Sequence, residues 1–286
     1  MRGRIKLRQL AAATVGAVAM FAPISSAGAA TQKVAHEHVT ATLTYHGTSP
    51  VRQNPHLVIT LDGTVVYDHA VTSKWCGKEC APNVIAGTRK VVHLVHFQPQ
   101  GPPSVLLDLY SGGAHCCAIE QVYTLSSPHG SVVKTERNFG DPGVRLVKLG
   151  AKGTVDLLSA DDSFAYEFTD FAASGLPIEI LSFSHQSFHT ITKSFPSLIA
   201  KDAAQWMSAF HAQASSHYAD TVGVVAAWAA DEDMLGHSSV VARFLSREAR
   251  AGHLNSAISP VTPSGDKFVG ALQKFLRQQG YLHPRR

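Results

Sequence analysis

Apolar and polar residues alternate along much of the chain between residues 37 and 192. Over residues 38–45, valine, alanine, leucine and tyrosine alternate with histidine and threonine, which is the two-residue period of a half-buried strand. Residues 57–61 and 64–67 flank an Asp-Gly pair, which favours the type I′ turn of a hairpin. Residues 105–107 are apolar on both faces and predict a central strand. Further strands are expected at 90–97, 104–110, 119–125, 131–137, 143–149, 154–159, 177–183 and 187–192.

Near Ser194 the period changes to that of a helix. From there on, apolar residues recur three and four positions apart in four segments, the first of which begins near Pro196. Glycines end the last three helices, at Gly236, Gly252 and Gly280. Strands followed by helices predict an α+β fold. We expect an antiparallel β-rich domain over residues 31–193, built as a sandwich or a propeller-like sheet, and a four-helix domain over residues 194–286.

The first thirty residues have the pattern of a secretory signal peptide. Four basic residues near the start are followed by an uncharged apolar run and then by small residues up to Ala30. A membrane anchor is the alternative, but Pro23 interrupts the apolar run, which falls short of the ~20 residues that a span needs. We therefore predict cleavage after Ala29 or Ala30, and a secreted protein with no membrane span after cleavage.

The signal peptide accounts for the net positive charge of the chain. It holds four of the 25 basic residues and none of the 21 acidic ones, so the mature chain has 21 of each. This balance gives no support to a nucleic-acid partner. The acidic run at residues 231–233 lies near the end of a predicted helix, where it costs little, and is interpreted as a solvated surface.

The cysteines are Cys76, Cys80, Cys116 and Cys117. An even number in an exported chain predicts two disulfides, for which three pairings are possible. Neighbouring side chains of a strand point to opposite faces, which disfavours a bond between Cys116 and Cys117. We expect each of these two to pair with Cys76 or Cys80, which would hold the 76–80 loop against the strand.

Four segments stand out, at residues 108–117, 159–166, 176–178 and 225–231, and the most specific part is the run Gly-Gly-Ala-His-Cys-Cys at 112–117. Together they resemble a group of exported bacterial proteins with no assigned function. The resemblance implies shared architecture and export. It implies no activity.

Some proteins of this group carry an Asp-rich loop like the calcium loops of FG-GAP or VCBS propeller repeats. Here Lys148, Gly150 and Lys152 stand where Asp or Asn would bind the ion, and only Gly153 and Asp156 fit the pattern. Two lysines would repel a cation, so we predict no calcium at this loop, although the strand-turn-strand shape is expected without it.

His115 beside Cys116 and Cys117 has the residue types of a nucleophile with a neighbouring base. A working thiol must be reduced, whereas export leads to an oxidising environment. We therefore favour a structural disulfide over a thiol enzyme.

Asp161 and Asp162 follow a predicted strand, in the kind of loop that often carries function. They are candidates for a catalytic acid pair or for part of a metal site, and the alternative is that they cap a turn. Glu120, Glu136 and Asp141 are further carboxylates that, with Asp161, could supply a glycosidase pair.

Sixteen histidines follow the signal peptide, and two close pairs among them suggest zinc binding. His36 and His38 share one strand face, whereas His93 and His96 are three apart, so their rings face opposite ways. The chain has no HExxH and no paired CxxC spacing. We expect no metal and no cofactor.

The interpretation we favour is a secreted, non-enzymatic binding or structural module with an unknown extracellular or cell-surface ligand. One alternative is an extracellular hydrolase that uses carboxylates near Asp161 and Asp162 or the His115 region. A second alternative is a histidine-based metal binder.

Overall fold

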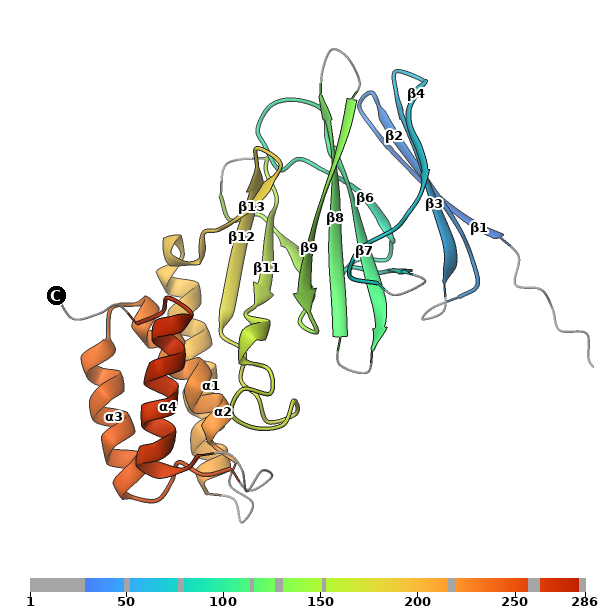
Figure 1. Ribbon diagram of the computed structural model, residues 1–286. Coiled ribbons are helices and arrows are strands. Elements are labelled where there is room, and N and C mark those ends of the chain that lie inside the picture. The colour runs from blue at the N-terminus through green and yellow to red at the C-terminus, as the bar shows by residue number, and fades with distance from the viewer. Residues whose placement is uncertain are drawn as a thin grey trace, which may run out of the picture.

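The computed structural model describes residues 29–48, 52–76, 80–113, 116–126, 131–150, 153–215, 220–256 and 263–282. Three antiparallel sheets come first in the chain and four helices follow, which confirms the predicted α+β class (Figure 1). The first sheet lies at one end of the molecule and the helices at the other. Residues 1–28 of the expected signal peptide lie outside the described residues, and Ala29 and Ala30 begin the first strand.

Each sheet is built from strands that follow one another closely in the chain. The first sheet has the order β1 (Ala29–His36), β2 (Val39–His46), β3 (Gln53–Leu61), β4 (Thr64–Ala70). The middle sheet has the order β5 (Ala81–Asn83), β7 (Ser104–Gly113), β8 (Cys116–Ser126), β9 (Ser131–Gly140), and β6 (Val92–Val95) also pairs with β7. The third sheet has the order β10 (Arg145–Val147), β11 (Asp156–Ala160), β12 (Ile178–Ser184), β13 (Ser187–Thr190).

The alternating pattern of β2 sets which of its faces is buried. Val39, Ala41 and Leu43 are fully buried, while the threonines between them are only partly covered. At the next hairpin, Asp62 and Gly63 have φ angles of 51° and 80°, which confirms the type I′ turn between β3 and β4.

β7 is a central strand of the middle sheet, as predicted, and its residues 104–109 are buried on both faces. Leu107 belongs to the core shared with Leu57 of the first sheet. Its neighbour Leu106 belongs to the core shared with Leu181 of the third sheet. Successive side chains of one strand therefore fill two different cores.

β1 and β5 were not predicted. β1 is an edge strand in which only Val34 is buried, so its polar pattern carries no clear periodicity. β5 has three residues and contains Pro82. Such short or edge strands are set by pairing with a neighbour, since the local sequence favours them weakly.

The helices match their predicted positions. They are α1 (Pro196–Ala214), α2 (Val222–Met234), α3 (Ser238–Arg250) and α4 (Gly265–Gln278). Positive φ angles at Gly236, Gly252 and Gly280 end the last three. α2 is buried from Val222 to Asp231 and forms the centre of the helical core. Within the described ranges, no helix has both the length and the apolar character required to cross a membrane.

The connection between β11 and β12 packs into the helical core. It begins with a short helix, η1 (Asp162–Phe164), and sends Phe164 and Phe168 among the helices. The Phe164 ring meets that of Phe275 edge to face, with centroids 4.8 Å apart. This connection joins the third sheet to the helices.

The disulfide pairing that we expected is wrong. Cys76 pairs with Cys80, and Cys116 pairs with Cys117. The expectation assumed a regular strand, but the β7–β8 ladder shifts in register between Tyr110 and Gly113, where β8 begins, so strict alternation does not apply. Each disulfide is therefore local, although Cys76, Cys80 and Cys117 belong to one core cluster and Cys116 packs against it.

Candidate functional site

Asp161 and Asp162, adjacent in the chain, line two different cavities. The junction cavity, of about 430 Å³, lies where the third sheet meets the ends of α2 and α4, and contains Asp161. The Trp75 groove, of about 520 Å³, lies along β9 and the β12–β13 turn, and contains Asp162. The two acids therefore do not form one catalytic pair.

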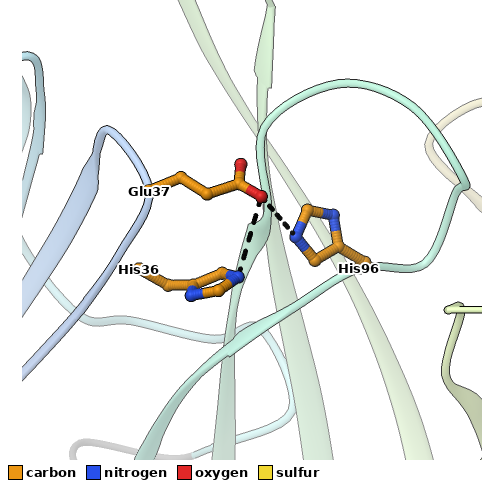
Figure 2. A group of neighbouring side chains, drawn as sticks. All are labelled: His36, Glu37 and His96. Atoms are coloured by element: carbon orange, nitrogen blue, oxygen red, sulfur yellow. Dashed lines mark ion pairs between the residues drawn. The ribbon is translucent and has the colours of Figure 1, made fainter.

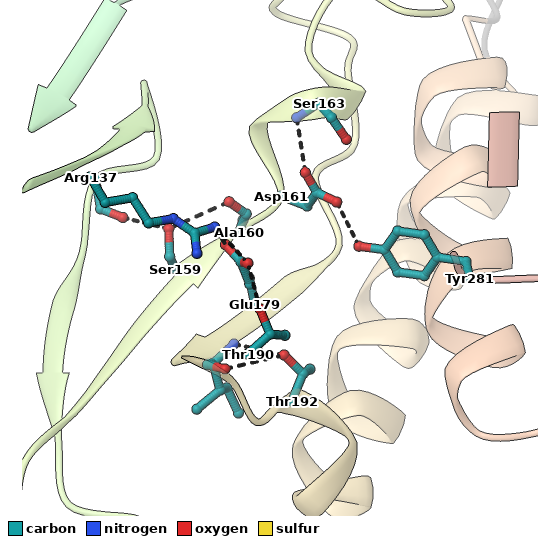
Figure 3. Close-up of polar contacts among 11 residues, drawn as sticks. Arg137, Ser159, Ala160, Asp161, Ser163, Glu179, Thr190, Thr192 and Tyr281 are labelled. Atoms are coloured by element: carbon teal, nitrogen blue, oxygen red, sulfur yellow. Dashed lines mark hydrogen bonds and ion pairs between the residues drawn. The ribbon is translucent and has the colours of Figure 1, made fainter. Parts of the chain in front are cut away.

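In the junction cavity, Asp161 ties the sheet to the helices. One carboxylate oxygen accepts a hydrogen bond from the N–H of Ser163 at 3.0 Å, which caps η1. The other accepts from the hydroxyl of Tyr281, just after α4, at 2.8 Å (Figure 3). Burial and the negative charge of Asp161 raise the pKa of Tyr281, so the phenol stays protonated and keeps donating.

Glu179 of β12 is the second acid of the junction cavity. Arg137 of β9 donates two hydrogen bonds to its carboxylate, at 2.8 and 2.9 Å, and Thr190 donates a third at 3.2 Å (Figure 3). Burial raises the pKa of Glu179, although the charge of Arg137 opposes this. Each carboxylate oxygen of Asp161 and Glu179 thus accepts at least one hydrogen bond from within the protein.

A third acid, Asp231 of α2, lies behind this cavity and is fully buried. Burial, together with the nearby Asp202, raises its pKa to about 10, so it is protonated at neutral pH. Asp202 accepts hydrogen bonds from the N–H of Ile178 and from the indole of Trp206, both at 3.0 Å. The interpretation of residues 231–233 as a solvated run was therefore wrong for Asp231 and Asp233, which are both buried because α2 is enclosed by the other helices.

The Trp75 groove has an exposed aromatic side chain on its wall. Trp75 is 47% exposed and lies in the loop after β4, directly before the Cys76–Cys80 disulfide. Lys74 lies over the indole, with its Nζ 5.0 Å from the ring centroid. The other lining residues are Thr135, Glu136, Arg137, Asn138, Gly140, Asp162, Gln186, Ser187 and Phe188.

Two acids of this groove have pKa values shifted in opposite directions. Burial raises the pKa of Asp162, although the N–H of Asp141 donates to it at 3.3 Å. Burial also acts to raise the pKa of Glu136. The hydrogen bond from Gln121 and the charge of Lys134 outweigh burial, so the pKa of Glu136 lies below its ordinary value. Asp162 is therefore easier to protonate than an ordinary aspartate, and Glu136 is harder to protonate than an ordinary glutamate.

Gly140 makes room for Asp162. A β-carbon at Gly140, whose φ is +66°, would lie 2.0 Å from the Asp162 carboxyl. The close approach and the positive φ both require glycine here. The Asp162 side chain is thus held against the backbone of β9.

The other candidates from the sequence are dispersed. Glu120 is fully buried in the middle sheet, opposite Asp108 in the β7–β8 register. Burial raises the pKa of Glu120, and burial raises that of Asp108 to about 7. Asp141 is exposed on the loop after β9. The expected glycosidase set is therefore not brought together, and His115 lies outside the described residues.

In the described part of the calcium-like loop, the side chain of Asp156 contacts the backbone. The Asp156 carboxylate accepts hydrogen bonds from the N–H groups of Leu149 and Gly150, at 3.2 and 2.8 Å. β10 and β11 pair antiparallel on either side, so the strand-turn-strand shape is present. Asp156, which fitted the calcium pattern, thus holds the loop backbone.

Sequence reasoning missed Trp75, Arg137, Glu179 and Tyr281. The sequence held one indication for Trp75: it stands beside a disulfide cysteine outside the predicted strands, where a large side chain is less easily buried in a core. The other three carried none, because Arg137 and Glu179 are 42 residues apart and Tyr281 lies 120 residues from Asp161.

Two known proteins are similar to part of the chain. The probable thylakoid lumen protein sll0997 of Synechocystis is 28% identical over 198 residues, which are 63% of this chain and 57% of that protein. The uncharacterized protein y4bJ of Sinorhizobium fredii is 24% identical over 195 residues, which are 64% of this chain and 30% of that protein. The chain thus spans 57% of the length of the first relative and 30% of the length of the second. No family model and no solved structure matches it.

Proposed function

We propose that the protein is an exported, non-enzymatic binding module that holds a neutral polysaccharide chain in the Trp75 groove. The exposed indole of Trp75 carries this proposal. Tryptophan is highly buried in most proteins, and an exposed one on the wall of a groove is typical of an interaction surface. The apolar C–H face of a sugar ring packs on such an indole.

The polar side chains of the groove suit sugar hydroxyls. Arg137, Asn138 and Gln186 supply N–H donors, and Glu136 and Asp162 supply acceptors. Arg137 is held in place by Glu179, so little side-chain entropy is lost when a ligand binds. Both signs of charge line the groove, which favours a neutral ligand over a charged one.

Export is supported by the expected signal peptide and by the name of one relative, a probable thylakoid lumen protein. Disulfides at Cys76–Cys80 and Cys116–Cys117 agree with an oxidising destination. A polymer of the cell surface or wall would be accessible to a protein in such a compartment.

The junction cavity gives less support to a catalytic function. A general acid or base must exchange a proton with its substrate. Both oxygens of Asp161 and both of Glu179 already accept internal hydrogen bonds. Their arrangement fits structural connections of the third sheet, to the helices through Asp161 and to the middle sheet through Glu179.

One observation favours a second candidate, a glycoside hydrolase acting in the same groove. Glu136 and Asp162 line it together, with pKa values displaced in opposite directions. Glycosidases use such a pair, with a protonated acid for the leaving group and a charged carboxylate as base or nucleophile. Asp162 would be the acid and Glu136 the charged partner.

Sedimentation with insoluble chitin, cellulose and β-1,3-glucan, three neutral polymers, tests the binding proposal. We expect the secreted protein to sediment with at least one of them, and Trp75→Ala to weaken binding by ~2 kcal/mol, which is about 30-fold. Trp75→Phe should retain most of the affinity. Val65→Ala, at an apolar side chain of the first sheet that is 55% exposed, is the matched control and should bind like the wild type.

Release of soluble sugars from the bound polymer separates the two candidates. A binding module releases no soluble sugar. A hydrolase releases sugars with reducing ends, and Asp162→Asn should abolish this release while the variant still binds the polymer. Binding to none of the three polymers, or equal binding by Trp75→Ala and the wild type, would overturn the assignment of the groove.

A further inference from the structure

We propose that His36, Glu37 and His96 form a binding site for a divalent ion of the zinc type, at the contact between the first and middle sheets. His36 ends β1, Glu37 lies in the β1–β2 turn, and His96 directly follows β6 (Figure 2). Their potential ligand atoms all lie within 4.8 Å of one another. This site is separate from the Trp75 groove and does not depend on its function.

The spacing of the three ligand atoms suits a tetrahedral ion. One Glu37 oxygen lies 3.3 Å from Nε2 of His96 and 3.7 Å from Nε2 of His36. Zinc–ligand bonds of about 2.0–2.1 Å place neighbouring ligand atoms of a tetrahedron roughly 3.3 Å apart. The two imidazole rings are edge to face, with centroids 5.5 Å apart, and their nitrogens can approach further by small side-chain rotations.

The chemistry of the ligands selects the ion. Two imidazoles and one carboxylate suit zinc and neighbouring transition metals, whereas calcium and magnesium prefer oxygen ligands alone. Three protein ligands leave a fourth position for water or for another ligand. The side chains of His36 and Glu37 are 57% and 45% exposed, and that of His96 is 25% exposed, so the ion has access from solvent.

Backbone contacts set this grouping. Glu37 has a φ of 52°, which belongs to the tight β1–β2 turn. The carbonyl of His96 accepts a hydrogen bond from the N–H of Val155 at 2.8 Å, which holds the loop after β6 in place. The turn and the loop therefore meet in a defined way before any ion binds.

The site takes one histidine from each pair noticed in the sequence. His38 faces Asp62, with 2.7 Å between its Nδ1 and the carboxylate. His93 hydrogen-bonds to the carbonyl of Lys90 at 2.9 Å. Their sequence neighbours, His36 and His96, are 60 positions apart and meet because β1 and β6 belong to adjacent sheets.

Zinc titration of the secreted full-length protein, produced without a histidine tag, tests the site. By calorimetry we expect one zinc ion per chain, and a loss of affinity of at least ~10- to 100-fold in His96→Ala and in His36→Ala. His56→Ala is the matched control, because His56 also faces a carboxylate, Asp68 at 2.6 Å, but lies outside this group of three ligands. Calcium should not bind at this site.

Thermal unfolding distinguishes a lost ligand from a damaged fold. Zinc should raise the melting temperature of the wild type and of His56→Ala, but not that of His96→Ala, while all three melt alike in the presence of a chelator. Wild type that binds no zinc would show that the cluster is an ion pair alone. Equal losses of zinc affinity in His56→Ala and in His96→Ala would also overturn the proposal.

Discussion

Replacing Asp231 by asparagine is expected to make the stability of the protein less dependent on pH. Asp231 is fully buried in α2, and burial with the nearby Asp202 raises its pKa to about 10. The carboxyl is therefore protonated in the folded protein at neutral pH and ionised in the unfolded chain. Folding must take up a proton at this position.

The cost of that proton follows from the two pKa values. The carboxyl has a pKa of 3.8 in the unfolded chain, and keeping it protonated above that pKa costs about 1.4 kcal/mol for each pH unit. At pH 7 the cost to folding is therefore about 4 kcal/mol. Because the folded state binds the extra proton between pH 3.8 and about 10, stability falls as pH rises through this window. Asparagine has the same shape, is neutral at every pH and can donate an N–H to Asp202, so Asp231→Asn lacks the cost.

Urea unfolding at pH 5 and at pH 8, followed by the helical circular dichroism signal, measures the effect. The stability of Asp231→Asn relative to the wild type should rise by about 4 kcal/mol between the two pH values. Leu272→Ala is the control, because it removes a buried apolar side chain of α4 and should cost about 2–5 kcal/mol equally at both. If the difference in stability between Asp231→Asn and the wild type is the same at both pH values, the conclusion that Asp231 is protonated in the folded protein is refuted.

Two further substitutions test contacts of the third sheet, one with the helices and one with the middle sheet. Tyr281→Phe removes the hydroxyl that donates to Asp161 and should cost about 1.5–3 kcal/mol in urea unfolding, and an unchanged stability would show that this bond does not hold the helices to the third sheet. Arg137→Met leaves Glu179, whose side chain is 15% exposed, without its cation, and should cost about 1–3 kcal/mol at pH 8. The loss should be smaller at pH 4, where a protonated Glu179 needs no cation, and an equal loss at both pH values would contradict this account.

Hydrophobic period was sufficient to predict most of the elements. β2 alternates strictly, so one face had to be buried, and Val39, Ala41 and Leu43 are indeed fully enclosed. α4 likewise buries Phe268 and Leu272 as its spacing predicts. These elements can be predicted from the sequence because their burial pattern repeats within a few residues.

The buried acids could not be predicted in this way. Asp231 and Glu120 have polar side chains that local pattern assigns to the surface, yet both are fully enclosed. Their burial follows from the position of α2 inside the helical core and of β8 inside the middle sheet. Which elements become central depends on contacts among all of them.

The sequence by itself determined the α+β class, most of the strands, the four helices, the hairpin turn and the helix ends, because each depends on neighbours in the chain. The tertiary structure alone decided the cysteine pairing, the separation of Asp161 from Asp162 and the meeting of His36 with His96. Side chains separated by tens of residues meet only when sheets and helices pack, and the direction of one side chain depends on the exact register of its strand. The groove and the metal site both belong to this second class.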